Sequence, residues 1–98
     1  MRQDPRLLGK WSTDISDPTT REKYGRASME FRQDGMLVYT AHGKDRDQVI
    51  LLDYEADGSV LTTNQPSAPR EERTHYELPS RDYLVLSFGG IRSCFTRV

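Results

Sequence analysis

The sequence predicts an all-β domain, an up-and-down antiparallel β-barrel of about eight strands with one short helix near residues 17–25. Two observations carry this prediction. Apolar and polar residues alternate with period two in segment after segment, and Asp-Gly or Gly-Gly pairs separate several of these segments. No stretch of ten or more residues has helical periodicity. Strands in this order could also stack as a sandwich, but closure removes both sheet edges, so we favour the barrel.

The clearest hairpin spans residues 26–42, where two alternating segments flank an Asp-Gly turn. A two-residue loop would place Phe31 opposite Val38. A three-residue loop places Phe31 opposite Leu37 and gathers the apolar side chains of both strands on one face. Because a slip by one residue moves a whole strand's apolar set to the other face, we predict the second register.

Further strand segments have the same alternation or a short apolar run bounded by turn residues. They follow a first strand around Trp11 and comprise residues 48–55, 59–64, 73–78, 83–88 and 91–98. A proline-rich loop, residues 64–70, interrupts this series. A chain of 98 residues with this organisation fits a single domain, residues 1–98.

The short helix is predicted from its end signals. Asp17 is a suitable N-cap, Pro18 suits the first helical position, and Gly25 can take the left-handed conformation that ends a helix. About two turns of helix fit between the first two strands, which is enough to cover one opening of a barrel.

Composition narrows the classes of function. Fourteen basic and fifteen acidic residues leave a net charge of −1, which argues against a nucleic-acid partner. The single cysteine, Cys94, excludes an internal disulfide and a cysteine metal cluster, and we expect it to be a small buried side chain. No apolar run is long enough to span a membrane, so a soluble protein is expected. If Met1 is the natural start, a cytoplasmic location is expected.

Known catalytic motifs are absent from the sequence, and we predict neither catalytic residues nor a metal or other cofactor. His42 is expected at a strand end and His75 on the outer side of a strand. The acidic pair Asp45 and Asp47 alternates with basic residues, as is typical of a solvated turn.

Two short motifs carry a family resemblance. Gly9-Lys10-Trp11 in the first strand, followed by a short helix and a meander, resembles the lipocalin-like proteins of the calycin group. The strand that ends in Phe31-x-x-Asp34-Gly35 is similar to bacterial lipocalin-like domains of unknown function. The resemblance implies that Trp11 packs beneath an arginine of the last strand, for which Arg97 is the candidate, and that the pair closes one end of the barrel. A guanidinium stacked on an indole is worth roughly 0.5–2 kcal/mol.

The resemblance, together with the aromatic inner face, implies a small apolar or aromatic ligand, and we predict a non-catalytic binding protein. The chain departs from the family in two features that concern ligand binding. It is shorter than a lipocalin, and it has only half of the carboxylate clamp of fatty-acid-binding proteins. The side chains predicted to face the interior and bind the ligand are Met29, Phe31, Leu37, Tyr39, Tyr54, Tyr76 and Phe88. We expect the site at an open end, near residues 17–25 and the 64–70 loop.

Two alternatives remain at this point. An eight-stranded barrel can be filled by its own side chains, and such a barrel would act as a protein-protein interaction module, with a protein partner or a second copy as in a homodimer. The irregular loop around residues 64–73 would suit such docking. The third reading is a lipocalin-like cyclase or isomerase in which a tyrosine hydroxyl donates a proton.

Overall fold

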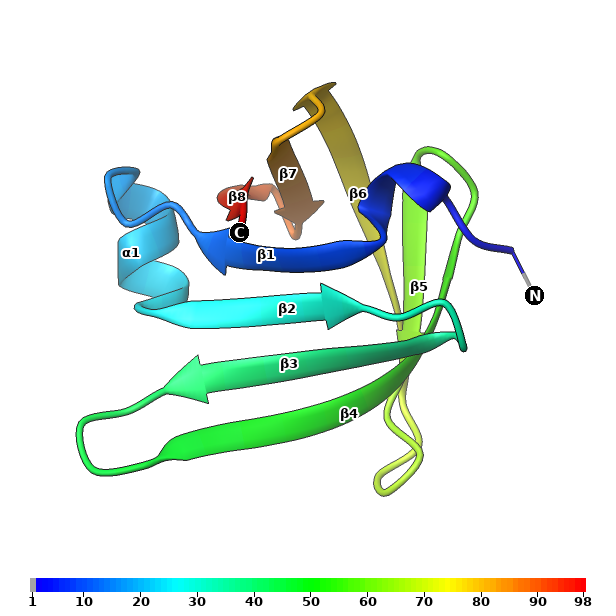
Figure 1. Ribbon diagram of the computed structural model, residues 1–98, viewed down its shortest axis with the longest axis horizontal. Helices are drawn as coiled ribbons and strands as arrows, with labels where there is room; N and C mark the ends of the chain where they lie inside the picture. Colours follow the sequence, from blue (N-terminus) through cyan, green and yellow to red (C-terminus); the bar gives the residue numbers. More distant parts are fainter. Residues whose placement is uncertain (1) are drawn as a thin grey trace.

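Eight antiparallel strands form a closed barrel in the computed structural model, which describes residues 2–98 (Figure 1). Each strand pairs with the next along the chain, and the last strand pairs with the first. The strands are β1 (Gly9–Thr13), β2 (Ala27–Phe31), β3 (Met36–His42), β4 (Asp47–Ala56), β5 (Val60–Asn64), β6 (Glu71–Ser80), β7 (Tyr83–Phe88) and β8 (Ile91–Arg97). The predicted all-β up-and-down barrel is confirmed.

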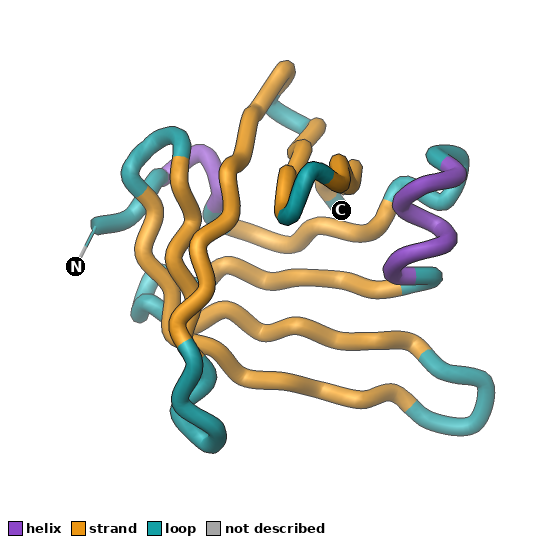
Figure 2. The backbone as a smooth tube through the Cα atoms, turned by 180° about the vertical axis from the view of Figure 1, so that it is seen from behind, coloured by secondary structure: helices purple, strands orange, loops and turns teal. Residues whose placement is uncertain are grey.

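Among residues 2–98 there is one α-helix, α1 (Pro18–Tyr24), which lies between β1 and β2 and begins and ends as its sequence signals predict. The Asp17 side chain accepts a hydrogen bond from the Thr20 N–H, and Gly25 follows the helix with a φ of 62°. Without a tertiary contact, a helix of seven residues is too short to be stable in water. Its packing against β8 and β1 therefore holds it in place (Figure 2).

The two ends of the barrel differ. At one end, here called the closed end, a 3-10 turn (Pro5–Leu7) lies beside the β2–β3, β4–β5 and β6–β7 turns. The opposite end, here called the helical end, carries α1 together with the β3–β4, β5–β6 and β7–β8 connections. The sequence did not predict the 3-10 turn.

The first hairpin has the predicted register, with Phe31 opposite Leu37 and Met29 opposite Tyr39. The inward side chains of all eight strands meet in one core. Its buried members are Leu7, Trp11, Met29, Phe31, Leu37, Tyr54, Ala56, Leu61, Tyr76, Leu84, Leu86 and Phe95.

Two expectations about side chains are wrong. Phe88 has the same strand parity as the buried Leu84 and Leu86, but it is the last residue of β7 and lies beyond the core, so that 42% of it is exposed. Cys94 alternates with the buried Ser93 and Phe95 and is therefore on the outer face of β8, where it is only half-buried.

Strand β6 also differs from its prediction. It continues to Ser80 rather than ending at Leu78, and its pairing with β7 is irregular between Glu77 and Ser80. Pro79 lies within this irregular part. A proline lacks the N–H that a regular ladder requires, so an irregularity at this position is expected.

Candidate functional site

The closed end is sealed by contacts of Arg97 and Trp11. The Arg97 guanidinium carbon lies 4.2 Å from the centre of the Trp11 ring, and the indole N–H donates to the Leu7 carbonyl oxygen at 2.9 Å. Arg97 also donates to the carbonyl oxygens of Leu8 at 2.9 Å and Arg6 at 2.7 Å. These bonds tie the last strand to the 3-10 turn and the strand that follows it.

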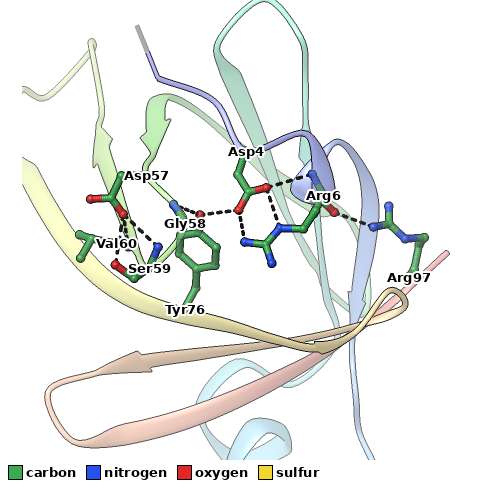
Figure 3. A network of polar contacts seen from close by, with 8 residues as sticks. All are labelled: Asp4, Arg6, Asp57, Gly58, Ser59, Val60, Tyr76 and Arg97. Atoms are coloured by element: carbon green, nitrogen blue, oxygen red, sulfur yellow. Dashed lines mark hydrogen bonds and ion pairs between the residues drawn. The ribbon is translucent and has the colours of Figure 1, made fainter.

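A polar network continues from this seal across the closed end (Figure 3). The Tyr76 hydroxyl donates to Asp4 Oδ2 at 2.8 Å and accepts from the Gly58 N–H at 2.7 Å. Arg6 pairs with the same carboxylate at 2.7 Å. The hydrogen bond from Arg6 lowers the pKa of Asp4, whereas burial and then the hydrogen bond to Asp4 raise the pKa of Tyr76 to about 12.

Most residues predicted to bind a ligand belong to the core. Five of them are buried in contact with one another and with the closed end: Met29, Phe31, Leu37, Tyr54 and Tyr76. Phe31 and Tyr54 pack edge to face with ring centroids 5.1 Å apart, and the Tyr54 hydroxyl donates to the Arg32 carbonyl. Their side chains belong to one buried core cluster of the barrel.

The two remaining candidates, Tyr39 and Phe88, lie towards the helical end. Tyr39 is partly buried and contacts Tyr24 of α1, with ring centroids 6.4 Å apart. Tyr24 also packs edge to face on Phe95 at 5.6 Å. The Lys23 ammonium lies 5.2 Å from the Tyr24 ring and 5.5 Å from the Phe88 ring. The helix thus brings an aromatic cluster together at this end.

Ser93 is the one buried polar side chain without a partner among residues 2–98. Its Oγ makes no hydrogen bond, and only 1% of the residue is exposed. Ser93 lies opposite the buried Leu86 and two residues before the buried Phe95, on the inward side of β8. A buried hydroxyl that lacks a partner costs about 1–3 kcal/mol, and almost all buried polar groups are hydrogen-bonded. Ser93 is therefore a buried hydroxyl whose hydrogen-bonding capacity is not used by the described part of the protein.

The sequence analysis missed Ser93, although a signal for it was present. Ile91, Ser93, Phe95 and Arg97 alternate along β8, so the position of Arg97 on the inner side also assigns Ser93 to that side. A serine among apolar inward residues is the kind of exception that calls for an explanation.

Outer surfaces offer open pockets as well. One of about 640 Å³ lies on the outer face of β7 and β8 and is lined in part by Asp17, Tyr83, Arg92 and Cys94. Near it, the Tyr83 hydroxyl donates to Asp14 Oδ2 at 2.9 Å, and hydrogen bonds to Cys94 and Asp14 raise the pKa of Tyr83. The pKa of Asp14 is lowered, first by its hydrogen bond from Ser16.

Both histidines, His42 and His75, are exposed on the surface of the barrel. Within the part of the chain that the structure describes, no three His, Cys, Asp or Glu side chains are grouped closely enough to hold a metal ion. His75 is exposed on the outer face of β6, and His42 at the end of β3 pairs with Asp47 at 3.3 Å and contacts Ser28.

Across residues 2–98, none of the helices has the length and apolar character needed to cross a membrane. Comparison with protein-family models, with curated proteins and with solved structures finds no match.

Proposed function

We propose that this protein is a lipocalin-like, non-catalytic binding protein for a small apolar or aromatic molecule that carries one hydrogen-bonding group. The binding site comprises Ser93 and the aromatic cluster of the helical end, Tyr24, Tyr39, Phe88 and Phe95. The unpartnered hydroxyl of Ser93 carries the proposal, because small-molecule sites are mostly apolar with a few fixed polar groups.

Features of the fold support the family part of this proposal. They are the eight-stranded meander closed by β1 and β8, the short helix between the first two strands, and the stacking of Arg97 on Trp11. The buried core limits the ligand to a small one, held near α1 rather than deep in the barrel.

A pair of probe molecules tests the site. 2-Naphthol and 2-fluoronaphthalene have nearly the same shape, and only the first has a hydroxyl group. We expect saturable binding of both, observed as chemical-shift changes at Tyr24, Tyr39 and Phe95. Replacing Ser93 by alanine should weaken 2-naphthol about three- to tenfold, because one hydrogen bond is worth about 0.5–1.5 kcal/mol, and should leave 2-fluoronaphthalene unchanged.

The same substitution should stabilise the protein without ligand. Ser93→Ala removes a buried hydroxyl that has no partner, so the free energy of unfolding in urea should rise by about 1 kcal/mol. Ser87→Ala, on the outer face of β7, is the matched control and should change neither quantity. Absence of saturable binding, or an equal effect of Ser93→Ala on both probes, would contradict the proposed site.

A filled barrel that docks on another protein is the second candidate. The burial of five predicted ligand-binding side chains in the core favours it. The surface that such docking would use is argued in the next subsection from an independent observation.

A further inference from the structure

Strand β4 is longer than the strand that should cover it. It spans ten residues, Asp47–Ala56, but β5 pairs only with residues 53–56. Residues 47–52 pair with β3 alone. Figures 1 and 2 show that β5 runs away from β4 and that no other segment lies along the outer edge of this half of the strand. Residues 47–52 of β4 therefore form a free strand edge.

The direction of the backbone groups on this edge follows from the ladder. The Tyr54 N–H donates to the carbonyl of Gly35, next to β3, so the backbone N–H and C=O of Tyr54 point towards β3. In an antiparallel strand alternate residues bond to opposite neighbours, so Leu52, Ile50 and Gln48 also bond towards β3. The N–H and C=O groups of Val49 and Leu51 consequently point away from β3, to the free edge.

The same two residues expose apolar side chains. Val49 is 57% and Leu51 49% exposed on the outer face, and Val38 of β3 is opposite Leu51 and only partly buried. Natural proteins usually protect a free edge with charged residues, prolines or bulges. Here the middle of the edge is apolar and regular. An extended strand is the one occupant that can satisfy these backbone groups and cover these side chains together.

Charge restricts the identity of that strand. Asp47 is on the same outer face as Val49 and Leu51, two positions before Val49, whereas the position opposite Asp53 is already filled by Asn64 of β5. The free part of the outer face thus presents one acidic and two apolar side chains in alternate positions. A complementary strand has two apolar side chains in alternate positions and a basic residue two positions beyond one of them.

We propose that the edge of β4, residues 47–52, binds by strand addition an extended segment of another protein that has this basic–apolar–apolar pattern. A second copy of the chain fits less well. The two-fold pairing that opposes Val49 and Leu51 brings Asp47 of each copy to the position opposite Asp53 that Asn64 of the other copy already fills.

A blocked pentapeptide tests the proposal, with valine at positions 1 and 3, lysine at 5 and threonine at 2 and 4, so that an antiparallel strand places the lysine opposite Asp47. We expect saturable binding to the full chain with a Kd below about 1 mM. Amide hydrogen exchange identifies the mode of binding. In the free protein the Ile50 and Leu52 amides should be protected and the Val49 and Leu51 amides should exchange rapidly. The peptide should protect the second pair.

Three variants and one altered peptide act as controls. Leu51→Lys should weaken binding at least tenfold, whereas Thr62→Lys, on the outer face of the fully paired β5, should not. Asp47→Lys should weaken the lysine peptide about two- to fivefold and strengthen to the same extent a peptide with glutamate at position 5, in line with the size of exposed ion pairs.

Three results would overturn the proposal. One is no saturable binding of the lysine peptide at concentrations of a few times 1 mM. The second is binding without protection of the Val49 and Leu51 amides, which would mean contact through side chains only. The third is protection of these amides by increasing protein concentration alone, together with a dimer in sedimentation, which would assign the edge to a second copy.

Discussion

Arg97 combines stacking, hydrogen bonding and charge in one side chain. Its planar guanidinium covers Trp11 and donates to two main-chain carbonyls at once, a geometry that lysine cannot reproduce. We expect Arg97→Lys to lower the free energy of unfolding by about 1–3 kcal/mol, because main-chain carbonyls lose a charged donor and Trp11 loses the stacked guanidinium. The emission of Trp11, the sole tryptophan, reports urea unfolding. Arg92→Lys, at an exposed position of the same strand, should stay within about 0.5 kcal/mol of wild type.

Asp4 and Tyr76 limit the pH range over which the closed end contributes its full stability. The pKa of Asp4 is lowered in the folded protein, so its contribution to stability is present above the unfolded pKa of 3.8 and is lost as the pH falls through the folded value. The pKa of Tyr76 is raised from 10.0 to about 12, so its contribution is complete below pH 10 and is lost as the pH rises towards 12.

The variants Asp4→Asn and Tyr76→Phe test the acidic and the alkaline loss of stability separately. Asp4→Asn should be less stable than wild type near neutral pH, and this difference should shrink as the pH falls below about 4. For Tyr76→Phe, the difference from wild type in the free energy of unfolding should instead shrink above pH 10. Urea unfolding at each pH measures both. A constant difference across the acid range for Asp4→Asn would show that its carboxylate does not contribute through its charge.

At the scale of elements, α1 is connected to β8 by a short relay of hydrogen bonds. Asp17 accepts from the Thr20 hydroxyl at 2.6 Å, and the Thr20 oxygen accepts from the Cys94 N–H at 2.7 Å. Asp17→Ala removes both the N-cap and the partner of Thr20, and we expect a loss of about 1 kcal/mol. Hydrogen exchange should rise mainly in residues 18–24, because local openings release α1 without unfolding the barrel.

Asp17→Asn is the matched control, since asparagine is an equally good N-cap. It should retain most of the protection of α1. If Asp17→Ala instead raises exchange uniformly in all strands, α1 does not open independently. In that case the aromatic cluster of the helical end would be as rigid as the core.

At the scale of the whole molecule, local signals determined what was predictable. Alternation and the Asp-Gly turn predicted the register of the first hairpin because both act over a few residues. The position of Phe88 was not predictable in this way. Strand parity places a side chain on a face, but the depth at which the core ends depends on the stagger of all eight strands.

Two further features, the hydroxyl of Ser93 and the free edge of β4, could not be predicted from the sequence for a similar reason. The hydroxyl of Ser93 stands out only when every neighbour that could bond to it is known. The free edge of β4 depends on where β5 begins to pair, which the alternation of residues 48–55 does not reveal. The extent of strand pairing and the satisfaction of polar groups are properties of the assembled barrel.

The pairing of β1 with β8 has a consequence for how the barrel assembles. Seven of its pairings join strands that are neighbours along the chain, so each can form early as a hairpin, whereas the Trp11–Arg97 pairing joins opposite ends of the sequence. Closing so long a loop carries the greatest entropic penalty of the eight, and non-local pairing slows folding. The pairing of β1 with β8 at Trp11 should therefore form last, and the fluorescence of Trp11 should follow the rate of that final step.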